Sequence, residues 1–101
     1  MDMPKTIKVG PHVYSVLRKP ASTLGENIGH CDSSSLQIWV KQRLRKSKAQ
    51  EILLHEILHA LILQALDTEE KHDDEAFVVV VAPLLLQVIQ DNPDLLAYLT
   101  Q

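Results

Sequence analysis

Apolar and polar residues alternate near the N-terminus, which is the pattern of half-buried strands. Residues 7–9 show this alternation, and Gly10-Pro11 then marks a turn. Residues 13–17 can form the returning strand, and residues 20–27 are expected to form a loop. The start of the chain therefore predicts a hairpin with one face against a core.

A second hairpin is predicted further on, with strands over residues 28–32 and 35–40 and a turn at Ser33-Ser34. Every second residue from Leu36 to Val40 is apolar, so one face of this strand should be buried. Trp39 would then lie on the wetter face, where it could cover a helix end or line a groove.

The pattern changes to that of a helix after a run of basic residues. Ser47 and Gln50 have the spacing of a capping box, which predicts a helix from about Lys48 to Leu66 with Ser47 as its N-cap. Residues 52–63 are apolar except for two histidines and a glutamate. A helix that is apolar all round is typically buried.

An acidic segment, residues 67–75, precedes a long apolar run. We expect a second buried helix from Glu75 to about Gln90, although a strand over Ala76–Val81 followed by a helix from Pro83 is an alternative. Residues 93–99 could form a short final helix. The expected fold is α+β, a small antiparallel sheet of three to four strands packed on two main helices, in a single domain over residues 1–101.

Composition restricts the possible partners. The net charge is −3, which does not suggest nucleic acid or an acidic membrane as a partner. The longest apolar run, residues 76–86, is too short to span a bilayer, and the first residues do not resemble a signal peptide. Cys31 is the only cysteine, so no intrachain disulfide can form. These features indicate a cytoplasmic protein.

Residues 55–59 read His-Glu-Ile-Leu-His. On a helix, His55 and His59 lie one turn apart on the same face, where two imidazoles can bind one metal ion, usually Zn²⁺. Glu56 can then take a proton from a metal-bound water, as in the H-E-x-x-H motif of zinc peptidases. Ile62 and Ala65 replace the Gly and His of the longer metzincin motif, which excludes that class.

Catalytic zinc usually has three protein ligands, so one more is needed. We expect Glu75, because it precedes a buried run and its carboxylate could point inward from a helix beside the motif. Asp74 and His72 are alternatives, and Asp67 is less favoured.

An enzyme of this kind would use Glu56 as general base and then as acid toward the leaving amine. Such sites often include a donor for the oxyanion, and Tyr98, Tyr14 and His72 are the candidates here. The strand over Ser35–Val40 could align an extended peptide by strand addition.

The segments I-L-L-H-E-I-L-H-A-L-I, H-D-D-E-A-F and Q-V-I-Q-D-N-P-D-L resemble small phage and prophage proteins of the metallopeptidase type. These are similar to the catalytic core of the ImmA/IrrE-like zincins, and the order of elements looks like a minimal gluzincin. The resemblance implies zinc ligands at His55, His59 and Glu75, with Glu56 catalytic.

Two functions are therefore expected. The first is a small zinc metallopeptidase, located in the cytoplasm of a bacterial host cell if phage-encoded, which hydrolyses a protein or peptide. The second is a non-catalytic binding or assembly module that keeps a zincin fold with a structural or vestigial metal site. An exposed edge strand and the apolar second helix would allow dimerisation without requiring it.

Overall fold

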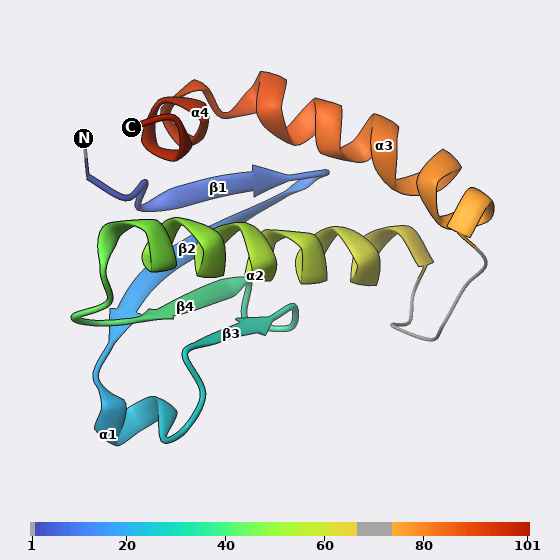
Figure 1. Ribbon diagram of the computed structural model, residues 1–101. Helices are drawn as coiled ribbons and strands as arrows, with labels where there is room; N and C mark the ends of the chain where they lie inside the picture. Colours follow the sequence, from blue (N-terminus) through green and yellow to red (C-terminus); the bar gives the residue numbers. More distant parts are fainter. Residues whose placement is uncertain (1, 67–73) are drawn as a thin grey trace.

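The computed structural model of the chain describes residues 2–66 and 74–101 (Figure 1). Within these residues, four strands and four helices follow in this order: β1 (Thr6–Val9), β2 (His12–Lys19), α1 (Ala21–Leu24), β3 (Gly29–Asp32), β4 (Gln37–Lys41), α2 (Lys46–Leu66), α3 (Asp74–Asp91) and α4 (Pro93–Leu99). The fold is α+β, as the sequence predicts.

The four strands form one sheet in the order β1-β2-β4-β3. The outer pairs are antiparallel, but β2 and β4 are parallel, so the expectation of a purely antiparallel sheet is wrong for the central pair. The cause is the path of residues 20–36. They carry the chain through α1 and β3, and β4 then enters between β2 and β3. Alternating polarity identifies strands but does not give the direction of their partners.

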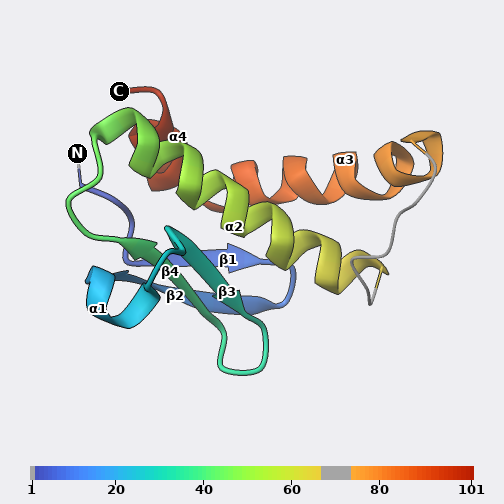
Figure 2. The ribbon, with the colours of Figure 1, turned by 60° about the horizontal axis from the view of Figure 1, so that its bottom comes forward.

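One face of the sheet packs against α2, α3 and α4, as Figure 2 shows. Alternate strand residues point into this layer, and those with no exposed surface include Ile7, Val9, Ile38 and Val40. Leu53 and Ile57 of α2 are equally buried and face them. Burial of these aliphatic side chains supplies the main driving force for folding, at about 25 cal/mol per Å² of apolar surface.

The predicted strands are confirmed with small shifts of their ends. The loop expected before β3 contains α1, and Leu36 lies in the β3–β4 turn with φ of 56°, not in β4. Trp39 is half-buried on the sheet face away from the helices, as expected. Its indole Nε1 donates a hydrogen bond to Gln37 Oε1 at 2.9 Å, so it covers neighbouring strand residues and not a helix end.

The helices agree with the sequence except at the start of α2. Ala49 N donates to Arg45 O at 2.9 Å, so the carbonyl of Arg45 accepts the first hydrogen bond of the helix. Helix α2 begins at Lys46, and Ser47 lies inside it. The predicted N-cap at Ser47 is therefore wrong. Helix α3 includes Pro83, and the alternative of a strand over Ala76–Val81 is also wrong.

Helix α2 is not buried all round, although its sequence suggests it. Leu54 is 37% exposed and His55 is exposed, because a chain of 101 residues has one sheet and one further helical layer with which to cover it. Within residues 2–66 and 74–101, no helix has the length and apolar character needed to cross a bilayer.

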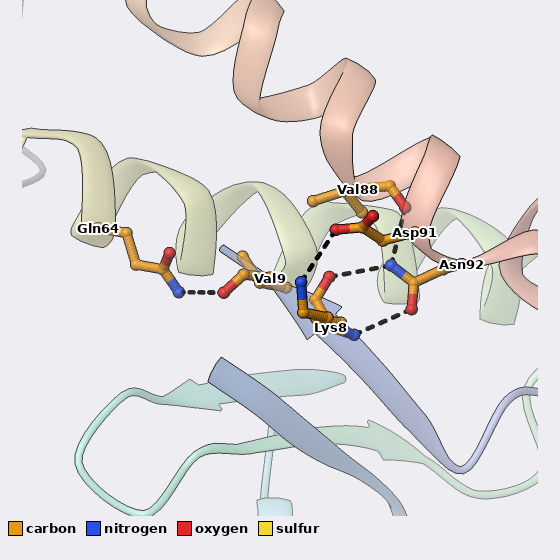
Figure 3. Close-up of polar contacts among 6 residues, drawn as sticks. All are labelled: Lys8, Val9, Gln64, Val88, Asp91 and Asn92. Carbon is orange, nitrogen blue, oxygen red and sulfur yellow. Dashed lines mark hydrogen bonds and ion pairs between the residues drawn. The ribbon is translucent and has the colours of Figure 1, made fainter. Parts of the chain in front are cut away.

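The end of α3 is fixed to β1 by Asn92, as Figure 3 shows. Lys8 N donates to Asn92 Oδ1 at 2.9 Å, while Asn92 Nδ2 donates to Lys8 O at 2.9 Å and to Val88 O at 2.7 Å. Beside it, the Lys8 ammonium lies 3.3 Å from Asp91 Oδ2. On the same strand, Gln64 Nε2 of α2 donates to Val9 O at 2.8 Å. Side-chain amides thus connect both long helices to β1.

Substitution of Asn92 by Ala should lower the free energy of unfolding by about 1–3 kcal/mol, because backbone groups of Lys8 and Val88 lose their partners. Asp91→Ala is the matched control. It removes a surface ion pair and should cost about 1 kcal/mol or less. Urea unfolding of both variants measures the difference, and equal costs would show that the amide has no special structural role.

Candidate metal centre and its pocket

The two histidines of the motif converge on one point. His55 and His59 lie on successive turns of α2, and their Nε2 atoms are 3.0 Å apart. Their rings meet edge to face, with centroids 4.7 Å apart and planes at 68°. Both imidazoles therefore present nitrogen atoms to the same volume of space, as the spacing on a helix predicts.

Burial differs sharply among the three motif residues. Glu56 is 7% exposed and is the buried charged residue of the described core, whereas His55 is exposed and His59 is half-buried. The expectation of two buried histidines around a buried carboxylate is thus wrong for the histidines. The reason is angular: Glu56 points toward β3, while the two rings lie further round α2 toward solvent.

The motif residues line a pocket of about 300 Å³ together with residues from the start of β3 and the segment before it. The described contributors outside α2 are Asn27, Gly29, His30 and Cys31. Strand β3 is an edge of the sheet and pairs with β4. The pocket therefore lies where helix α2 meets an edge strand.

Gly29 allows close contact between this edge strand and α2. A Cβ at Gly29 would lie 2.8 Å from Glu56 Oε2 and 2.7 Å from Ile52 Cγ2, both far inside van der Waals contact. The absence of a side chain lets β3 approach the glutamate closely. Glycine in a predicted strand is a signal of such an approach, but the sequence alone does not identify its partner.

The two histidines fit a zinc ion in spacing. Tetrahedral zinc with Zn–N distances of about 2.0–2.1 Å holds two ligand nitrogens about 3.3 Å apart. The separation of 3.0 Å between the Nε2 atoms is close to this value. Among the described residues, however, no group of three His, Cys, Asp or Glu side chains is arranged to hold a metal. The described part of the chain therefore brings together two candidate ligands.

The third ligand expected from the sequence is not tested by this arrangement. Glu75 and Asp74 are backbone positions in the first turn of α3, and their side chains lie outside the described part of the chain. His72 and Asp67 fall in residues 67–73, which are also outside it. Glu75 stays a prediction.

The two tyrosines considered as oxyanion donors are core residues. Tyr14 is 1% exposed and Tyr98 is 5% exposed, and neither is among the described residues that line the pocket. Burial raises the pKa of Tyr14, opposed by a side-chain hydrogen bond with Gln64. Burial also raises the pKa of Tyr98, opposed by the charge of Arg18. Both aromatic rings are packed in the core and lie outside the lining of the histidine pocket.

The edge that could accept an extended peptide is β3, not the strand predicted over Ser35–Val40. Strand β4 has neighbours on both sides, β2 and β3.

The β3–β4 turn is held by Asp32, whose Oδ1 accepts hydrogen bonds from Ser34 N, Ser34 Oγ and Ser35 N at 3.0, 2.8 and 3.3 Å. These bonds, that from Ser34 first, lower the pKa of the Asp32 carboxyl to about 2.

With this geometry in hand, comparison with known proteins gives no family: no protein-family model, curated protein or solved structure matches the chain.

Gly29→Ala should lower the free energy of unfolding by about 1–3 kcal/mol, because its methyl group would overpack Ile52 and Glu56. Introducing Ile52→Ala into that variant removes one of the two collisions. In a double-mutant cycle, the cost of Gly29→Ala should therefore be smaller in the Ile52→Ala background. Additive costs would show that β3 does not depend on this contact.

Asp32 predicts a pH dependence of stability. Its pKa is about 2 in the folded protein against an ordinary value of 3.8, so the ionised carboxylate stabilises the fold. Its contribution is complete above about pH 5 and is lost as the pH falls through 3.8 toward 2. The stability difference between the parent and Asp32→Asn, measured by urea unfolding, should shrink over this range. A constant difference would contradict the role of the turn.

Proposed function

We propose that the protein is a zinc-dependent metallopeptidase that hydrolyses a protein or peptide. One observation supports this above all others: the Nε2 atoms of His55 and His59 lie 3.0 Å apart, in the same pocket as the carboxylate of Glu56. A structural zinc site requires the histidines but does not require a neighbouring buried carboxylate.

In this proposal, His55 and His59 hold the metal, and Glu75 at the head of α3 is the third ligand. Bound zinc would supply an acidified water and a polarised carbonyl. Glu56 then receives a proton from the attacking water and transfers it to the leaving amine. Glu56 is 7% exposed and lines the same pocket as the two histidines, which places its carboxylate out of bulk water and beside the proposed metal position.

The substrate in this proposal lies along β3. An edge strand can pair with an extended peptide through main-chain hydrogen bonds, which hold the peptide without regard to its sequence. The proximity of Gly29 to Glu56 Oε2 would keep such a peptide close to the general base. A cytoplasmic location belongs to the same proposal and agrees with a chain that has a single cysteine.

Metal content is the first test. The purified protein should bind about one zinc per chain, measured by elemental mass spectrometry, and His59→Ala and Glu75→Ala should lose it because each removes a ligand. The exposed His12 on β2 provides the control, and His12→Ala should keep the metal. Failure of the parent to bind zinc would overturn the proposal.

Catalysis is tested separately with Glu56→Gln. This variant should bind zinc like the parent but lose at least about 100-fold in hydrolysis of a peptide library, because the general base is removed. A parent that binds zinc but cleaves nothing would instead support the non-catalytic binding or assembly module.

A further inference from the structure

The basic residues are concentrated at one end of the molecule. Of the ten lysines and arginines in the chain, seven lie where β2 and β4 end and α2 begins. This basic end consists of Arg18, Lys19, Lys41, Arg43, Arg45, Lys46 and Lys48. The segments around it carry four acids, Asp2, Glu26, Glu51 and, on the neighbouring helix α4, Asp94. The chain is acidic overall, so this end has a charge opposite to that of the whole.

Two features show that the basic end has a cost in stability. Lys19 and Lys41 are direct neighbours in the parallel β2–β4 register, and like charges in such positions repel. Arg43 has φ of 63°, a conformation that glycine or asparagine would adopt with less strain. Among the described residues, Lys48 is the member of this group with an ion pair, to Glu51 at 3.2 Å. Arg18 Nη2 donates to Lys41 O at 3.0 Å and Lys19 lies over the Trp39 ring, so contacts within the fold account for part of this concentration of charge but not for all of it.

The basic end adjoins the candidate metal centre. Lys41 N donates to Ile28 O at 2.9 Å, so the end of β4 lies beside the residue before β3. Lys48 lies two turns before His55 on the same side of α2. Figure 1 shows that β3 starts near this end and runs away from it, beneath α2. A peptide along β3 would thus reach the basic residues at one of its two ends.

We infer that the peptide bound at this site is acidic on one side: it pairs antiparallel to β3 and carries Asp or Glu residues C-terminal to the paired segment. The direction follows from the strands. Antiparallel pairing is the more stable arrangement, and a strand antiparallel to β3 runs toward Gly29 and so ends at the basic residues. This inference rests on the proposed function for the location of the site, and it adds the class of substrate, an acidic peptide.

Nucleic acid fits the basic end less well. Proteins that bind single strands combine positive charge with exposed aromatic rings on which bases stack. Tyr98, which lines a pocket with Arg18 and Lys46, is only 5% exposed, and the half-buried ring of Trp39 is already covered. Lys19 Nζ lies 4.9 Å from the ring centroid and the His30 ring is 5.3 Å away. An acidic peptide needs no such platform.

Two peptides of identical composition test whether the acidic residues must follow the segment that pairs with β3. One is Thr-Val-Thr-Val-Thr-Glu-Glu-Glu and the other is Glu-Glu-Glu-Thr-Val-Thr-Val-Thr, each with an amidated C-terminus and the same fluorescent label on its N-terminal amine. Binding to zinc-loaded Glu56→Gln is measured by fluorescence anisotropy, so that hydrolysis does not interfere. Because both peptides carry the same charge, non-specific attraction is equal for the two.

The peptide with C-terminal glutamates should bind at least about tenfold more tightly, and the preference should weaken at high salt. In Lys41→Gln/Lys48→Gln the preference should fall to less than about threefold, because Lys41 lies beside the residue before β3 and Lys48 lies on the histidine side of α2. Neither side chain is buried, so this variant should stay folded. The matched control, Lys5→Gln/Lys8→Gln, removes two charges at the opposite edge of the sheet and should keep the preference.

Equal binding of the two peptides, a reversed preference, or no binding of either at 1 mM would overturn the inference. The proposed function is read separately, from zinc content and from cleavage by the parent. Ordered binding without cleavage would support the acidic ligand and contradict the peptidase. Cleavage with no dependence on the position of the glutamates would support the peptidase and contradict the acidic ligand.

Discussion

The contact between α2 and the sheet determines the position of every group in the candidate site. Leu53 and Ile57 pack one side of the helix against the strands, and neither residue has exposed surface. This fixes the rotation of α2 about its axis. The next positions round the helix then point Glu56 at β3 and the histidine rings toward solvent. A rotation by one residue would exchange these environments, so aliphatic packing controls the chemistry of the polar residues.

Within about one helical turn, Glu56 is buried while His55 is exposed and His59 is half-buried, so the three motif residues have different environments. Removing a carboxylate from water is costly unless it has partners. Solvent-facing imidazoles, by contrast, are accessible to a metal ion from solution. The arrangement suits a site in which a metal enters from outside and the base is positioned by the core beneath it.

Much of the fold follows from local patterns along the chain. The strands, the span of α2 and the final helix at Pro93–Leu99 were predictable from polarity, the H-E-x-x-H stretch and a proline. Contacts between segments that are far apart in the sequence were not predictable from these patterns. The parallel β2–β4 pair depends on where β4 enters the sheet, and the role of Gly29 depends on a residue of another element. For the site, His55, Glu56 and His59 came from the sequence, whereas the β3 wall of the pocket did not.

The amide of Asn92 also bears on how the chain folds. It joins residues separated by 84 positions, which closes almost the whole chain into a loop. Closing so long a loop costs conformational entropy, and this cost is smaller when the segments between its ends are already ordered. The sheet and α2 would therefore assemble first, and the α3–α4 junction would dock late. In that order of folding, substitutions at this junction would change the unfolding rate more than the folding rate.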